Sequence, residues 1–268
     1  MSGSPITQDD IEHFQTHGVV CIRGLFRDWV DVIAAGIQRN MENPGPYAKD
    51  VVTAADSGSF FDDYCNWQRI PEFQDIIENS SAALAAAAIM ESDTAQLFHD
   101  HVLVKEPGTS KVTPWHQDYP YYFVDGEQLV SFWIPVDPVK ETTLRFISGS
   151  HRWQRLVLPV RWLDDSNFYG NGTEYRPVPN PEAEPDAYPV LEWEMQPGDV
   201  VMFHYRTAHG SRANLSKDRR RALSLRWIGD DGRYATRPGP TSPPFPDHGM
   251  TPGQRLREDW FPVIWPKS

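Results

Sequence analysis

Residues 113–121 read Thr-Pro-Trp-His-Gln-Asp-Tyr-Pro-Tyr, and they place His116 two positions before Asp118. On an extended strand, side chains two positions apart lie on the same face. The imidazole of His116 and the carboxylate of Asp118 can therefore reach one metal ion together. The pair alone is a weak signal, because nine histidines among 268 residues often fall near an acid by chance. A hydrogen-bonded histidine at a strand edge explains it as well.

A second histidine would complete a 2-His-1-carboxylate set, the ligand set of non-haem Fe(II) oxygenases. Residues 197–199, Pro-Gly-Asp, form a turn signal, and residues 200–203 read as a buried strand. His204 then ends the strand pattern, and His209 follows five residues later with Ser211 close behind. Both histidines are candidates from this pattern.

A further strand is predicted from residue 220 to residue 228, in which Arg220 and Arg226 share a face. The elements His116-Gln-Asp118, His209-Gly-Ser211 and Arg220 together resemble the phytanoyl-CoA dioxygenase (PhyH-type) branch of the Fe(II)/2-oxoglutarate oxygenases. In that family an arginine stands eleven positions after the distal histidine, which matches the spacing from His209 to Arg220. The resemblance favours His209 over His204 and covers about residues 7–228.

The resemblance implies a set of cofactors, Fe(2+), 2-oxoglutarate and O2, and a hydroxylation or related oxidation of an unactivated C–H bond that releases succinate and CO2. Related halogenases have Ala or Gly at the position of Asp118, so the carboxylate argues for oxidation. No separate acid or base residue is expected. The implied iron ligands are His116, Asp118 and His209, and the implied 2-oxoglutarate contacts are Arg220, Ser211, Trp133, His101 and His99.

The expected fold is mainly β with flanking helices (α+β), a double-stranded β-helix of the jelly-roll or cupin-like kind, in one domain spanning residues 1–268. The sequence predicts helices at 7–16, 29–41 and 80–91, strands at 19–22, 97–105, 128–136, 200–203 and 220–228, and a loop at 43–59. Two positions depart from the family pattern: Thr142-Thr143 replaces Asn-Gly, and Ser148 replaces Pro.

Substrate contacts are expected from aromatic residues near the iron motif and from an insert. Tyr119 and Tyr122 follow the motif directly, and Trp162 lies in a Pro- and Asn-rich insert at about residues 152–188 that we interpret as a lid. Arg145 is a candidate contact for an anionic substrate. Core packing explains the tyrosines equally well, and a surface position explains the arginine. A Pro-rich tail at about 229–268 is expected to pack across the barrel or a neighbouring subunit.

The formal net charge of −12 and pI near 5.1 argue against nucleic acid or an anionic membrane surface as a partner. A small molecule is the expected partner, and the sequence leaves monomer and homodimer open. Two cysteines, no signal-peptide pattern and no long apolar run indicate a cytoplasmic protein. Two other functions remain open: a zinc-dependent hydrolase on the same ligand set, and a barrel that binds a small molecule without turnover.

Overall fold

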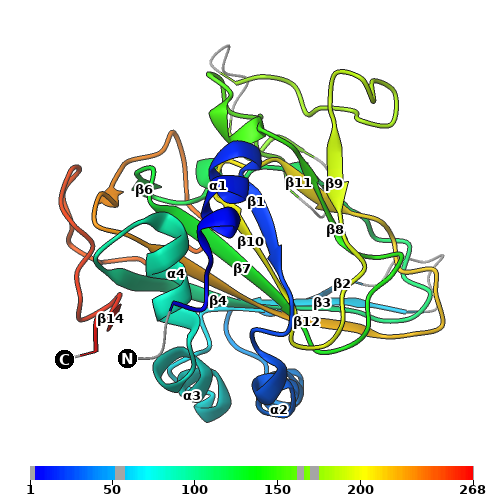
Figure 1. The fold of residues 1–268 in the computed structure, drawn as a ribbon, viewed down its shortest axis with the longest axis horizontal. Coiled ribbons are helices and arrows are strands. Elements are labelled where there is room, and N and C mark those ends of the chain that lie inside the picture. The colour runs from blue at the N-terminus through cyan, green and yellow to red at the C-terminus, as the bar shows by residue number, and fades with distance from the viewer. Residues whose placement is uncertain (1–3, 52–57, 162–165, 170–174, 268) are drawn as a thin grey trace.

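A computed structural model describes residues 4–51, 58–161, 166–169 and 175–267 as two antiparallel sheets with helices on one side (Figure 1). The larger sheet has the order β1 (Val19–Ile22), β10 (Val200–His204), β7 (Leu129–Pro135), β12 (Arg220–Ile228), β4 (Ala95–Lys105), β3 (Phe60–Tyr64) and β2 (Lys49–Val51), and β14 (Val263–Trp265) pairs with β4. The smaller sheet has the order β5 (Thr113–His116), β11 (His209–Ser211), β8 (Leu144–Ile147) and β9 (Val190–Glu192). A short pair joins β6 (Val124–Asp125) to β13 (Arg233–Tyr234).

The predicted jelly-roll architecture is confirmed, with one difference. Within the described residues the two sheets share no strand pairing, so the barrel is open along its sides. The segment predicted as a loop at 43–59 includes the edge strand β2, which was not expected because its three residues show no alternating pattern.

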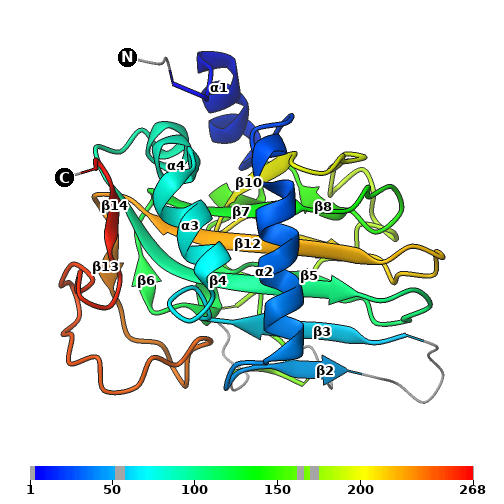
Figure 2. The same ribbon diagram turned by 90° about the horizontal axis from the view of Figure 1, so that it is seen from below.

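Three helices lie over the outer face of the larger sheet (Figure 2): α2 (Val30–Glu42), α3 (Pro71–Asn79) and α4 (Ala82–Met90). The fourth helix, α1 (Gln8–His17), packs beside β1 and α4. A capping box begins α1, since Thr7 and Asp10 bond each other's backbone N–H groups. Gly18 ends α1 with φ of +78°, a conformation that favours glycine. The sequence did not predict α3. Single 3₁₀ turns occur at η1 (Arg27–Trp29), η2 (Tyr119–Tyr121) and η3 (Ser150–Arg152).

The alternation of β12 separates the core from the interior of the barrel. Leu223, Leu225 and Trp227 pack with the helices in the main hydrophobic cluster. Arg220, Ser224 and Arg226, of the opposite parity, line a cavity between the sheets. The predicted shared face of Arg220 and Arg226 is therefore confirmed, and it faces the smaller sheet that carries His116 and His209.

The Pro-rich tail packs against the larger sheet through β14 and through Gln96 of β4. The buried amide of Gln96 donates hydrogen bonds to the carbonyl oxygens of Leu256 and Phe261. Among the helices that the structure describes, none has the length and apolar character needed to cross a membrane.

Candidate metal centre and adjoining cavities

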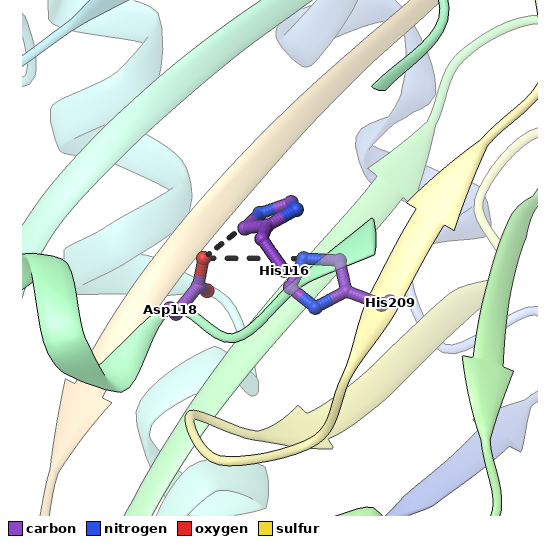
Figure 3. A group of neighbouring side chains, drawn as sticks. All are labelled: His116, Asp118 and His209. Carbon is purple, nitrogen blue, oxygen red and sulfur yellow. Dashed lines mark ion pairs between the residues drawn. The ribbon is translucent and has the colours of Figure 1, made fainter. Parts of the chain in front are cut away.

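His116, Asp118 and His209 meet at the edge of the smaller sheet (Figure 3). His116 is the last residue of β5 and stands opposite His209, the first residue of β11. One ligand atom from each of the three residues lies within 4.8 Å of the others. The Asp118 Oδ1 atom is 3.6 Å from His116 Nε2 and 3.9 Å from His209 Nε2. This spacing suits a single ion coordinated by three protein atoms.

The local backbone differs from the prediction in one respect. Asp118 does not continue the extended strand, because β5 ends at His116 and Asp118 has helical dihedrals, φ −67° and ψ −38°. It precedes the turn η2, which begins at Tyr119. The strand argument for a shared face is therefore wrong, although the two side chains do converge. The turn brings the carboxylate back towards His116.

Both histidines are held in the tautomer that a metal requires. His116 Nδ1 lies 2.8 Å from the carbonyl oxygen of Pro114, and His209 Nδ1 lies 2.9 Å from that of Thr207. Because a carbonyl oxygen only accepts, each Nδ1 carries the hydrogen, and each Nε2 presents its lone pair towards Asp118. Hydrogen bonds of this kind orient metal-bound histidines in proteins. Burial, followed by the neighbouring His116, lowers the pKa of His209 to about 3, so its ring is neutral.

The second oxygen of Asp118 is occupied by protein groups. Ser131 donates a 2.9 Å hydrogen bond to Oδ2, and Arg226 Nε lies 3.1 Å from the same atom. Burial alone would raise the pKa of Asp118, but Arg226 and the two imidazoles hold it well below its usual value. Only Oδ1 then faces the histidines. The sequence did not identify Ser131, and it mentioned Arg226 only for its strand face.

His204, the alternative candidate ligand, has both ring nitrogens hydrogen-bonded to backbone groups. Its Nε2 donates to the carbonyl oxygen of Glu127 at 2.9 Å, and its Nδ1 accepts from the Arg206 amide at 3.0 Å. It belongs to no metal-binding group among the described residues. The choice of His209 agrees with this geometry.

Protonation of His204 should weaken the fold in acid. Burial, more than the neighbouring His151, lowers its folded-state pKa to about 3, below the unfolded value of about 6.5. The unfolded chain therefore binds more protons, and stability is lost as the pH falls below about 6.5. Between pH 7 and pH 5, protonation of His204 should lower the free energy of unfolding by about 2 kcal/mol. Urea denaturation at the two pH values measures it, and in His204→Gln the difference should shrink by that amount. If His204→Gln lost as much stability between pH 7 and pH 5 as the wild type, His204 would not be the group responsible.

A narrow cavity extends from the metal centre between the sheets. Its lining comprises His101, Leu103, Thr113, His116, Trp133, Leu144, Phe203, His209, Arg220, Ser224 and Arg226. Arg220 is 2% exposed, and its Cζ lies 5.4 Å from the centre of the Trp133 ring. Within the described residues its guanidinium has no carboxylate partner and makes one hydrogen bond, to the carbonyl oxygen of Thr142 at 3.1 Å. Burial lowers its pKa to about 10, so it stays charged at neutral pH.

Lys105 is a second buried basic residue near this cavity, which the sequence did not single out. It pairs with Arg220 across β4 and β12, and its Nζ donates to Ser211 Oγ at 2.8 Å and to the Arg212 carbonyl at 2.9 Å. Burial, then Arg220, lowers the pKa of Lys105 well below its usual value. Ser211 itself bonds Thr113 at 3.0 Å and is not a lining residue. Thr113 stands between Ser211 and the cavity.

A wider cavity opens on the other side of the metal centre. Its lining comprises Lys49, Phe60, Asp62, Tyr64, His99, His101, Lys111, His116, Asp118, Tyr121, Tyr122, Val160, Arg161, Phe168, Arg226, Ser242 and Pro243. Tyr122, a predicted substrate contact, lines this cavity and also packs in a buried aromatic cluster. His99 and His101 were both predicted to contact 2-oxoglutarate. His99 lines only this wider cavity, whereas His101 lines both this cavity and the narrow one that contains Arg220.

Two predicted substrate contacts lie outside both cavities. Tyr119 accepts a hydrogen bond from Arg206 at 2.9 Å and is not a lining residue. Arg145 pairs with Glu182 and Glu192 near the surface and lies over the Trp115 ring, as the alternative interpretation expected. Trp162 lies outside the residues that the structure describes.

The insert is attached to the wider cavity through Tyr121. The hydroxyl of Tyr121 donates to the carbonyl oxygen of Val160 at 2.7 Å and accepts from its amide at 2.8 Å. Both Val160 and Phe168 of the insert line the cavity. The described part of the insert therefore forms one wall of this cavity.

Tyr121→Phe should loosen that wall. It removes both hydrogen bonds to Val160, and an unsatisfied buried group costs about 1–3 kcal/mol. Hydrogen exchange at the Val160 amide should accelerate about tenfold or more, while amides in the centre of β12 keep their rates. Unchanged exchange at Val160 would show that other contacts hold the segment.

Comparison with known proteins gives the family of the chain. Residues 14–222 match a family model described as phytanoyl-CoA dioxygenase (PhyH). A probable phytanoyl-CoA dioxygenase of Caenorhabditis elegans is 27% identical over 190 residues, 67% of this chain and 54% of that protein. A 1-deoxypentalenic acid 11-beta-hydroxylase of Streptomyces arenae is 32% identical over 132 residues, 48% of this chain and 44% of that protein. The chain thus spans about half the length of these curated relatives.

Solved structures show the same fold. The epimerase SnoN from nogalamycin biosynthesis, in complex with Fe3+, alpha ketoglutarate and nogalamycin RO, superposes with a TM-score of 0.76 at 18% identity, covering 96% of this chain and 98% of that one. EctD from S. alaskensis with 2-oxoglutarate and 5-hydroxyectoine has a TM-score of 0.69 at 16% identity, covering 96% and 88%. At these identities the likeness concerns the fold.

Proposed function

Because the chain belongs to the phytanoyl-CoA dioxygenase (PhyH) family, we propose that it is a non-haem Fe(II)- and 2-oxoglutarate-dependent oxygenase. It hydroxylates, or otherwise oxidises, an unactivated C–H bond of a small organic substrate and releases succinate and CO2. One of the relatives described above is a hydroxylase. The carboxylate at Asp118 supports oxidation at this centre.

The observation that carries the proposal is the buried guanidinium of Arg220, which has no carboxylate partner among the described residues. A buried arginine without an acidic partner is costly, and its five N–H donors form a fork that fits a carboxylate. Arg220 and His209 line the same narrow cavity. A dicarboxylic keto acid placed there reaches Arg220 with one carboxylate and the metal with its other end. A zinc hydrolase gives Arg220 no role.

The donor set fits a ferrous ion. His116 Nε2, His209 Nε2 and Asp118 Oδ1 would hold it, since the remaining atoms of these side chains are bonded to protein groups. Two imidazoles and one carboxylate on one side leave open positions for other ligands. The bound iron, with 2-oxoglutarate and O2, supplies the oxidising chemistry.

The cavity residues bind, orient and exclude water. Arg220 binds the distal carboxylate, and the Trp133 ring beside it covers the guanidinium. Leu144 and Phe203 add an apolar surface to the same cavity. A charge pair is stronger when water is excluded. Lys105 donates a hydrogen bond that holds Ser211 in place, while burial and the neighbouring Arg220 disfavour its charged form and lower its pKa.

The proposal is tested by succinate formation. Purified protein is incubated with Fe(II), 2-oxoglutarate and ascorbate, and succinate is measured with and without a metabolite library. We expect slow succinate release without substrate and stimulation by the substrate. Turnover that persists without 2-oxoglutarate and requires Zn(II) would replace the proposal with the hydrolase. Absence of succinate under every condition would favour a protein that only binds its ligand.

The partner in this proposal is a small molecule, because a net charge of −12 disfavours nucleic acid and anionic membranes. Cys21 and Cys65 are both free thiols. Free cysteines fit a reducing compartment, so we place the activity in the cytoplasm.

A further inference from the structure

Three polar residues form one side of the wider cavity: Asp62 of β3 and His99 and His101 of β4, together called the acceptor wall below. All three are at most 9% exposed. The cavity that they line also contains the metal ligands His116 and Asp118. The proposed function gives Asp62 no role, and the 2-oxoglutarate cavity does not include His99.

The hydrogen bonds of the acceptor wall determine what it offers a ligand. His99 Nδ1 lies 3.1 Å from the carbonyl oxygen of Asp100, so this nitrogen carries the hydrogen and Nε2 is an acceptor. Within the described residues, the buried His99 Nε2 has no hydrogen-bond partner. Burial, then Arg226, lowers the pKa of His99 well below its usual value, which keeps the ring neutral.

The other two residues add acceptors. His101 Nε2 is bonded to Asp62 Oδ1. Because the carboxylate accepts, Nε2 carries the hydrogen, and Nδ1 of the neutral ring has a free lone pair. In the described part of the chain, neither this Nδ1 nor the second oxygen of Asp62 forms a hydrogen bond. As far as the structure describes the chain, the three residues of the acceptor wall therefore offer lone pairs and no free donor.

The charges of the cavity lining affect which ligand groups the acceptor wall can bind. A ligand carboxylate would be attracted by Arg226, Lys49, Lys111 and Arg161 but repelled at the acceptor wall by the lone pairs and the charge of Asp62. A ligand ammonium would be attracted by Asp62 but repelled by those four basic residues of the same lining. A neutral donor satisfies the lone pairs without either conflict. The remaining walls include the rings of Tyr64, Tyr121 and Phe168, which suit an apolar body.

We propose that the acceptor wall binds a hydroxyl group of the substrate, so that the substrate is a neutral alcohol at its end near the metal. That this ligand is a substrate rests on the proposed function. Binding of the hydroxyl group to the acceptor wall requires neither iron nor 2-oxoglutarate. A hydroxyl anchored on His99 or His101 fixes which C–H bond of the molecule faces His116 and Asp118. These residues are then determinants of specificity.

Four probes with one phenyl body test the chemistry: benzyl alcohol, toluene, benzoate and benzylamine. Their dissociation constants are measured by ligand-observed NMR on the metal-free chain at pH 7. We expect benzyl alcohol to bind about three- to tenfold more tightly than toluene, the range of one net hydrogen bond. Benzoate and benzylamine should bind more weakly than the alcohol. Equal binding of toluene, or tighter binding of benzoate or benzylamine, would overturn the proposal.

Two variants test whether the acceptor wall causes the preference for benzyl alcohol over toluene. His99→Leu and His101→Leu should each reduce the preference for alcohol over toluene, whereas the control His13→Leu, on α1 and away from the cavity, should keep it. Retained preference in both wall variants would place the hydroxyl elsewhere. If either variant fails to fold, the wild-type ranking still decides. Succinate formation is assayed separately, so its failure would remove the oxygenase and leave the ranking intact.

Discussion

Replacing His209 by alanine is expected to lower succinate formation by more than a hundredfold and to abolish stoichiometric iron binding. His209 supplies one of three candidate ligand atoms, and its Nε2 is directed at Asp118 Oδ1 across 3.9 Å. Substitution of residues that merely orient metal ligands typically costs about 10- to 100-fold in metal affinity or activity. Loss of a ligand itself should cost more. Iron content after dialysis and the rate of succinate release measure the two effects.

His204→Gln is the matched control, because His204 is also buried and lies five residues earlier in the chain. Its ring nitrogens bond Glu127 and Arg206, so the variant should keep its iron, even where its stability changes. The opposite pattern, with iron retained in His209→Ala and lost in His204→Gln, would reassign the ligand.

Arg220→Leu is expected to raise the KM for 2-oxoglutarate by about 30-fold or more. Truncating one partner of a buried charge pair costs about 2–5 kcal/mol, and each 1.4 kcal/mol corresponds to a factor of ten. Without 2-oxoglutarate the same variant should be at least as stable as the wild type, since it removes a buried charge that has no acidic partner among the described residues. Thermal unfolding with and without 2-oxoglutarate should therefore show a ligand-induced stabilisation only in the wild type.

Arg221→Leu, one residue along β12, is the control. Arg221 points out of the barrel and forms an ion pair with Asp137 at 2.7 Å. Partly exposed pairs contribute about 1 kcal/mol or less, so the KM should change less than about threefold. A large effect in Arg221→Leu together with a small one in Arg220→Leu would move the anchor to the neighbouring residue.

The grouping of His116, Asp118 and His209, and the place of Arg220 in the adjoining cavity, could be predicted from short motifs taken together with the family resemblance. His116 and Asp118 are two residues apart, and the spacing from His209 to Arg220 carries the second half of the site. Regular elements were predicted where periodicity or capping was strong, as in α1, α4 and β12. The geometry by which Asp118 reaches the site was not predicted, because a single helical residue after β5 leaves no pattern in the sequence.

The residues around the ligands could not be predicted, because strand register brings them together. Ser131 and Arg226 are direct partners across β7 and β12, and both reach Asp118. Lys105 and Arg220 are partners across β4 and β12 in the same way. The sequence separation between such partners is large, and the alternation of each strand fixes a face without fixing the register. The proximity of Lys105 to Arg220, and that of Asp62 to His101, can be recognised only once the strand pairing is known.

The hold of Ser131 and Arg226 on Asp118 has a consequence for ion selectivity. With Oδ2 bonded to protein donors, the aspartate has a single oxygen to offer. Calcium favours six to eight oxygen ligands and often takes both oxygens of a carboxylate. A centre of two ring nitrogens and one oxygen meets few of those needs and suits a borderline transition ion. Calcium should therefore compete poorly for this centre, whereas divalent transition ions such as cobalt or zinc should compete with iron for it.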